Sequence, residues 1–279
     1  MVGDAGLVGI RAGGRTRSRE KARDHSGDGV ASRRSRVQVE AEDAPPAGEP
    51  AVSAAPRRRW LRKLVNRLIL VLLALAAIPL GLMLLYAVAP PVSNLMLARW
   101  FTGQPVTRIW TPLERIAPSL PLAVAASEDA RFCQHHGVDW VELRAAIQDT
   151  DEDGLPTRGA STLTMQTVKN LLLWQGRSPV RKALELPLAA LADIVWSKRR
   201  TMELYLNVAE WGDGIFGAEA AAQRYFRKSA ARLTPGESAR LAAVLPNPIR
   251  YDAEKPSRYV ATRAGRIAAR ARQQTLPCL

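Results

Sequence analysis

The sequence predicts a mainly α-helical domain that is preceded by one transmembrane helix. Three observations favour this fold class. An uncharged apolar run from Leu68 to Ala89 is long enough to cross a bilayer. From residue 113 onward, apolar residues recur mostly at helical spacing and are punctuated by helix caps. Strand signals are few, and the best of them covers Val106 to Trp110.

The N-terminal segment, residues 1–67, is predicted to be a disordered basic tail in the cytoplasm. Its first part is rich in Arg, Gly, Ala, Ser, Asp and Pro and has no apolar periodicity, so it cannot bury enough surface to offset chain entropy. A dense group of cations then precedes the apolar run: Arg57, Arg58, Arg59, Arg62, Lys63 and Arg67. Because this positive charge lies on the N-terminal side of the run, that side is expected to stay in the cytoplasm.

The transmembrane helix is assigned to residues 68–89. As a helix this run would span roughly 33 Å, against a hydrocarbon core of about 30 Å. Pro79 and Gly81 interrupt the run, which membrane helices tolerate. A cleavable signal peptide fits poorly, because the apolar core is too long and lies too far from Met1. Residues 90–279 are therefore expected to form one domain outside the cytoplasmic (inner) membrane.

Charge and composition narrow the classes of partner. The formal net charge of +14 divides about equally between the tail and the region after residue 90. Such a balance suits nucleic acid, anionic lipid or a phosphorylated substrate, and the membrane topology excludes nucleic acid. Cys133 and Cys278 could pair in an oxidising compartment or stay as free thiols. The histidines His25, His135 and His136 have no ligand-like spacing, so no metal site is predicted.

Two helix starts can be placed from their caps. Thr234 to Glu237 reads as a capping box with Pro235 at the first helical position, and this helix is expected to stop before Pro246. Ser178 reads as an N-cap with Pro179 as the first helical residue. The region from Leu184 to Leu206 then continues with apolar residues at helical spacing.

Two segments have side chains suited to chemistry. Glu128 and Asp129 are adjacent, and neighbours on a helix point about 100° apart, so one of them could face a cleft as a general base while the other holds the local backbone. A solvated acidic pair is the alternative. Gly159 to Thr162 reads as a turn that opens a helix, whose N–H groups and hydroxyls could receive an anion beside Lys169. An ordinary capped helix is the alternative there.

Two further segments follow. Arg177, Arg181 and Lys182 place three cations within six positions, although Arg181 and Glu185 could simply form an i, i+4 ion pair. The segment from Glu203 to Phe226 has glycines that indicate a loop between two helices, with structural packing as the alternative reading.

Together these segments resemble the peptidoglycan glycosyltransferase family, the polymerase domain shared by bifunctional penicillin-binding proteins and monofunctional transglycosylases. The resemblance covers roughly residues 95–255 and includes the five family blocks in order. Its most specific pair is the Glu-Asp…Phe…His…Gly…Asp block from Glu128 to Asp139 and the Gly-x-Ser-Thr…Gln…Lys-Asn block from Gly159 to Asn170. The last block runs from Leu241 to Pro248. A short tail, one membrane helix and one domain indicate a monofunctional member.

The resemblance implies a lysozyme-like helical fold and assigns roles to residues. Glu128 matches the catalytic base, which takes the proton from the acceptor's 4-hydroxyl as that oxygen attacks the anomeric carbon of the donor. Glu185 matches a second, assisting glutamate. The basic positions that stabilise the polyprenyl pyrophosphate leaving group match Lys169, Arg177, Arg181 and Lys182. The other substrate-binding positions match Ser161, Thr162 and Gln166. The reaction is expected to invert the anomeric centre.

The resemblance also implies the partners. The expected substrates are the lipid-linked disaccharide-peptide (lipid II) and the growing glycan strand, at the membrane and without nucleic acid. No cofactor is required by the sequence, and a divalent cation, Mg or Mn, and other wall-synthesis proteins are left open. No transpeptidase activity is expected, because the Ser-x-x-Lys signature occurs only at Ser18 to Lys21 in the tail.

One departure from the family pattern concerns Met165, which stands where the family usually has Gln. A thioether cannot replace both the donor and the acceptor of an amide, so substrate binding is expected to be weaker if that amide contacts substrate. Pro187 is also unexpected inside a helix. A lytic transglycosylase is the nearest alternative, but it would need no basic cluster. A non-catalytic membrane scaffold is the other, and the retained Glu128, Lys169 and Glu185 argue against it.

Overall fold

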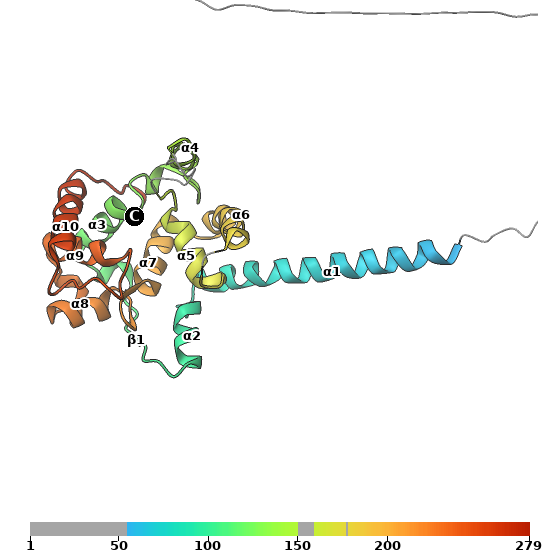
Figure 1. Cartoon of the computed structure of the whole chain (residues 1–279), viewed down its shortest axis with the longest axis horizontal. Coiled ribbons are helices and arrows are strands. Elements are labelled where there is room, and N and C mark those ends of the chain that lie inside the picture. The colour runs from blue at the N-terminus through green and yellow to red at the C-terminus, as the bar shows by residue number, and fades with distance from the viewer. Residues whose placement is uncertain (1–54, 150–158, 177) are drawn as a thin grey trace, which may run out of the picture. The chain divides into compact units, whose positions relative to one another are not determined.

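The computed structural model describes residues 55–149, 159–176 and 178–279, and these residues are mainly helical, as the sequence predicts (Figure 1). The prediction of disorder for residues 1–54 lies outside the described residues. The α-helices are α1 (Ala55–Tyr86), α2 (Asn94–Phe101), α3 (Ser119–Glu128), α4 (Trp140–Gln148), α5 (Leu163–Leu172), α6 (Pro179–Val195), α7 (Lys198–Val208), α8 (Ala218–Phe226), α9 (Pro235–Val244) and α10 (Arg258–Ala271). Short 3-10 helices are η1 (Leu113–Arg115), η2 (Phe132–Gln134) and η3 (Ala230–Arg232).

Helix α1 begins earlier and ends earlier than the predicted membrane segment. It starts at Ala55, so residues 55–67, which were expected in the disordered tail, are helical, and it ends at Tyr86. Basic residues are good helix formers, so the helical stretch can extend beyond the apolar run. Among the described helices, α1 is the one that is long and apolar enough to cross a membrane, and its apolar side chains are almost all exposed. The chain thus has one helix suited to a single-pass membrane anchor.

The last turn of α1 is bound to the helices that follow. Met83 is buried, and the Trp196 Nε1 donates to its carbonyl oxygen at 2.8 Å. The Arg200 guanidinium donates to the carbonyl oxygens of Tyr86, at 2.9 Å, and Ala89, at 2.7 Å. The bond to Tyr86 satisfies a carbonyl that the helix end leaves free, and the cation complements the helix dipole. The end of α1 is therefore fixed to α6 and α7.

Three apolar clusters are buried in the described residues, and two of them make up most of the interior. The larger one joins α3, α7, α8, α9 and α10, and α3 is buried along most of its length. The smaller one joins the end of α1 to α5, α6 and α7. It includes Leu171 and Leu173, whereas Trp174 is half exposed. Most of the leucine-rich stretch from Leu171 to Trp174 therefore packs in the core.

The segment between α7 and α8, where the glycines predicted a loop, contributes two strands to a small sheet. The described residues form three strands in the order β1-β3-β2, with β1 (Thr107–Arg108) parallel to β3 (Ile215–Phe216) and β2 (Glu210–Gly212) antiparallel to it. The segment is therefore a hairpin, with Gly214 in the left-handed region at its turn. Strands of two or three residues are too short to show an alternating pattern. The weak strand signal at Val106 to Trp110 did locate β1.

The predicted caps are present. Thr234 and Glu237 form a capping box at the start of α9, and Ser178 caps α6 with Pro179 at its first turn. Pro187 is accommodated inside α6, which continues to Val195. The predicted helical region from Leu184 to Leu206 is two helices, α6 and α7, separated at Trp196 and Ser197, because Ser197 caps α7.

Gly137 lets the loop after η2 approach α6 closely. Its φ is +76°, and a Cβ there would lie 2.2 Å from the Ala189 carbonyl oxygen. The Gly137 carbonyl oxygen also accepts a hydrogen bond from the Thr162 hydroxyl at 2.6 Å. A residue with a side chain would be strained at this φ and would also collide with the Ala189 carbonyl. This contact brings the loop after α3 to the start of α5.

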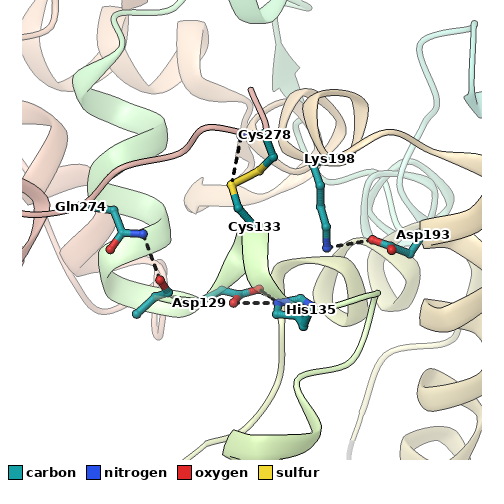
Figure 2. The surroundings of a disulfide bond; sticks show 8 residues. Asp129, Cys133, His135, Asp193, Lys198, Gln274 and Cys278 are labelled. Atoms are coloured by element: carbon teal, nitrogen blue, oxygen red, sulfur yellow. Dashed lines mark hydrogen bonds and ion pairs between the residues drawn. A yellow bond between two sulfur atoms is a disulfide. The ribbon is translucent and has the colours of Figure 1, made fainter.

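The two cysteines form a disulfide, which the sequence left open (Figure 2). The bond joins Cys133 in η2 to Cys278 near the end of the chain, with 5.6 Å between the Cα atoms. Beside it, the Gln274 Nε2 donates to the Ala130 carbonyl oxygen at 2.9 Å. The residues after α10 are therefore attached to the loop that follows Glu128.

Candidate active site

Glu128 and Asp129 occupy different environments because α3 ends between them. Glu128 is the last residue of α3, and Asp129 has the extended φ of −159°. Both oxygens of the buried Asp129 carboxylate lie 3.0 Å from the His135 Nε2 (Figure 2). One of these oxygens also accepts from the Leu163 N–H at 2.9 Å. Asp129 thus connects the end of α3 to the start of α5, while Glu128 is left for the cavity.

The Glu128 carboxylate is held from both sides. Its Oε1 accepts from the Ser127 hydroxyl at 2.9 Å and lies 3.5 Å from the Arg263 Nη2. Its Oε2 accepts from the Gln166 Nε2 at 3.3 Å. The Gln166 Oε1 in turn accepts from the Tyr205 hydroxyl at 3.2 Å, so the amide orientation is fixed. These contacts place an acceptor-only carboxylate at a defined position, as a general base requires.

Glu128 and Lys169 line two separate cavities that are linked through Gln166. One of about 460 Å³ is lined by Glu128 together with Ser161, Thr162 and Arg270. The other, of about 170 Å³, is lined by Gln166 and Lys169. The Gln166 side chain donates a hydrogen bond to the Glu128 carboxylate and so connects the walls of the two cavities. The arrangement presents a proton acceptor to one cavity and a cation to the other.

The start of α5 has protein partners for two of its free N–H groups, which agrees with the alternative of an ordinary capped helix. The N–H of Leu163 donates to Asp129, and the Thr162 hydroxyl accepts from the Met165 N–H at 3.1 Å. Thr162 is buried and also donates to Gly137, so its hydroxyl has two protein partners. An internal carboxylate thus accepts from the first free N–H of this helix. Thr162 therefore shapes the cavity wall.

Glu185 is the centre of a buried charge cluster on α6. Its carboxylate is buried and pairs with Arg181 through one oxygen and with Lys182, at 2.9 Å, through the other. Lys182 also donates to the Ser161 hydroxyl at 2.6 Å. The i, i+4 pair that the spacing suggested is thus present, and it orients both cations. Arg177, the other predicted cation of this group, lies outside the described residues.

Lys169 lies within the electrostatic reach of both groups of charges. Burial lowers its pKa below the ordinary 10.5, the Arg181 guanidinium lowers it further, and the Glu128 carboxylate acts in the opposite direction. The pKa of Lys182 is also lowered, by burial and then by Arg181 and Lys169. The three cations therefore repel one another, because the carboxylates present do not fully compensate them. Such a cluster favours a polyanionic ligand.

Comparison with known proteins decides the family. A family model described as Transglycosylase matches residues 94–272. The chain belongs to the transglycosylase family. Within it, relatives named biosynthetic peptidoglycan transglycosylase include those of Rhodopseudomonas palustris strain HaA2 and Agrobacterium fabrum. The first is 52% identical over 217 residues, covering 77% of this chain and 96% of the relative. The second is 54% identical over 213 residues, covering 76% and 94%.

The transglycosylase site draws on residues that the sequence did not single out. Ser127 and Arg263 contact Glu128. Tyr205, which contacts Gln166, lies in the segment from Glu203 to Phe226, where no residue was assigned a role. Arg263 is 135 residues from Glu128 along the chain, so spacing gives no sign of their contact. Among the described residues, no group of three or more His, Cys, Asp or Glu side chains is placed to hold a metal ion.

Met165 is buried away from both cavities, which removes the concern raised by its departure from the family pattern. The side chain is 1% exposed and packs against Val138 and Ala189, with Leu143 and Leu186 nearby. The thioether fills an apolar cluster between α5 and α6. In this chain, position 165 supports the packing of the site and does not line the cavities.

We expect Met165→Gln to lower stability without raising turnover. The new amide would be buried among apolar side chains, at a cost of about 1–3 kcal/mol. Thermal unfolding measures this loss, and Met165→Leu is the control, because an apolar exchange of similar volume usually costs less than about 1.5 kcal/mol. A Gln variant that is as stable as the parent and polymerises faster would show that position 165 reaches the substrate.

Proposed function

We propose that this peptidoglycan glycosyltransferase polymerises glycan strands from a lipid-linked disaccharide-peptide, with Glu128 as general base and release of polyprenyl pyrophosphate. The observation that carries the proposal is that Glu128 lines one cavity and accepts a hydrogen bond from Gln166, which lines a second cavity together with Lys169. Related chains that are about half identical bear the name biosynthetic peptidoglycan transglycosylase, which supports synthesis as the direction of the reaction.

The proposed step is a single displacement. The acceptor's 4-hydroxyl oxygen attacks the anomeric carbon of the donor while Glu128 takes the hydroxyl proton. The bond between that carbon and the pyrophosphate oxygen breaks, and the pyrophosphate leaves with the electron pair. Attack opposite to the leaving group inverts the anomeric centre, so no bond to the enzyme is formed. The carboxylate takes a proton from the nucleophile, as the base of an inverting glycosidase does, but the nucleophile is a sugar hydroxyl instead of water.

The cations Lys169, Arg181 and Lys182 are proposed to stabilise the departing pyrophosphate. Negative charge develops on the leaving oxygen, and oriented cations in a partly buried site act on it strongly. Burial, and after it the repulsion from neighbouring cations, lowers the lysine pKa values, and a bound polyanion would relieve this repulsion. Glu185 bonds Arg181 and Lys182, which favours a role in orienting these cations over proton transfer. A lytic transglycosylase releases no pyrophosphate, so its leaving group would not need such a cluster of cations.

We also propose that the N-terminus of α1 faces the cytoplasm and that the catalytic domain lies outside it. The basic residues at the start of α1 support this orientation. The Cys133–Cys278 disulfide supports it independently, because thiols in the cytosol are kept reduced.

Glu128→Gln is expected to lower polymerisation by about 10²–10⁴-fold while leaving the fold intact, because an amide keeps the shape but cannot accept the proton. Polymer formed from labelled lipid-linked disaccharide-peptide, resolved on a gel, measures the loss. Asp129→Asn is the companion variant. It should reduce activity less and lower the melting temperature more, since Asp129 has two buried partners. Near-normal polymerisation by Glu128→Gln would place the base elsewhere.

Lys169 is expected to set the alkaline limit of activity. Only its charged form can stabilise the leaving group, and since its pKa is lowered, that form is lost at a lower pH than for an ordinary lysine. Lys169→Arg should move the alkaline limb of the kcat profile upward, because a guanidinium stays charged. Lys169→Ala should cost about 10²-fold or more. Lys182→Arg is the control. If the alkaline limb of the kcat profile moved in Lys182→Arg and stayed in place in Lys169→Arg, the limit would belong to Lys182 on α6.

The orientation of α1 can be tested with single introduced cysteines, because the native pair is bonded and does not compete for reagent. A cysteine at Arg57 should be protected from a membrane-impermeant thiol reagent in intact cells, whereas one at the exposed Gln104 should be labelled. Permeabilised cells give the labelling control for both sites. Labelling at position 57 with protection at 104 would reverse the topology.

A further inference from the structure

A second positively charged surface lies on α10, away from the cations of α5 and α6. Val260, Ala264 and Ile267 face the core. Arg263, Arg266 and Arg270 recur at three- and four-residue spacing, so they follow one another along the adjacent side of the helix. We call these three residues the α10 arginine row. The helix packs against α3 and α9, which brings the row next to the end of α3.

The row lines a cavity of its own. This cavity, of about 240 Å³, has walls from Ser127, Tyr259, Thr262, Arg263, Arg266, Ile267 and Arg270. None of these side chains is a carboxylate. Ser127 and Arg270 also line the cavity that holds Glu128, so the two spaces adjoin. A ligand bound beside Glu128 could therefore extend a side group into the arginine-lined cavity.

Two charges of the row are uncompensated. Arg263 has a carboxylate partner in Glu128, 3.5 Å away. Arg266 and Arg270 are exposed, and within the part of the chain that the structure describes no carboxylate pairs with either of them. Guanidinium groups have a planar fork of donors that matches the two oxygens of a carboxylate. The cavity thus presents two free forks close to the reacting carboxylate.

We propose that the arginine-lined cavity binds carboxylates of the peptide carried by the sugar unit next to Glu128. Arg266 and Arg270 would then be specificity-determining residues that recognise the side arm of the glycan. This inference rests on the proposed function, because that substrate supplies a peptide with free carboxylates beside the reacting bond. Anionic lipid fits the site less well, since α10 lies on the side of the domain away from α1 (Figure 1).

The test compares two lipid-linked disaccharide-peptides, one with free peptide carboxylates and one with these carboxylates amidated, in neutral detergent. Arg266→Gln/Arg270→Gln should raise KM for the free-carboxylate substrate about tenfold with kcat unchanged, the effect of losing about one charge-assisted contact. Amidation should raise KM of the parent enzyme by a similar factor. The variant should gain no further increase on the amidated substrate, because the same contact is already missing.

The matched control is Arg258→Gln/Arg272→Gln. It removes the same charge from exposed positions at the two ends of α10, its first residue and its C-cap, and neither residue lines the cavity. Its KM should equal that of the parent enzyme for both substrates.

With the row variant, any of three outcomes would overturn the inference: an unchanged KM, an equal KM increase on both substrates, or an effect that appears only in vesicles with anionic lipid. The last would assign the row to the membrane surface. The parent enzyme keeps the two proposals apart. Absence of polymer from the free-carboxylate substrate would refute the proposed function, whereas polymer formation with a KM insensitive to amidation would refute only the carboxylate site.

Discussion

The buried Asp129 carboxylate is the contact on which the rest of the site depends. It binds His135 on one side and the first free N–H of α5 on the other. Both are polar groups that would be costly to bury without a partner. By joining the end of α3 to the start of α5, this residue fixes the separation between Glu128 and Gln166. The disulfide from Cys133 and the close approach at Gly137 hold the same loop from outside.

The cations near this junction fall into two groups, which differ in how far nearby carboxylates neutralise them. On α6, Glu185 binds Arg181 and Lys182, so these cations are oriented and partly neutralised. Lys169 stands between them and Glu128, and burial with the nearby guanidinium lowers its pKa. The positive potential of these cations favours a negatively charged ligand over a neutral one. The electrostatics therefore support a phosphorylated donor more strongly than a plain glycan.

Much of the fold could be predicted from local signals. The caps at Ser178 and Thr234 act within a few residues, so their spacing alone places the starts of α6 and α9. The apolar run of α1 is equally local. The hairpin at Gly212 to Gly214 was missed, because strands this short are held by pairing with β1 from a distant part of the chain. The helical start at Ala55 was missed because charge was read as the end of the helix.

By itself the sequence determined one long apolar helix suited to a membrane anchor, the helical class, and the order of motifs by which the chain resembles its family and from which roles for Glu128, Lys169 and the α6 cations were predicted. Only the tertiary structure decided which groups contact each other. It paired Cys133 with Cys278, buried Met165 in an apolar cluster, gave the α5 N-terminus to Asp129, and brought Arg263 to Glu128. These contacts join segments far apart in the chain, and their geometry follows from how the helices pack, which residue spacing does not encode.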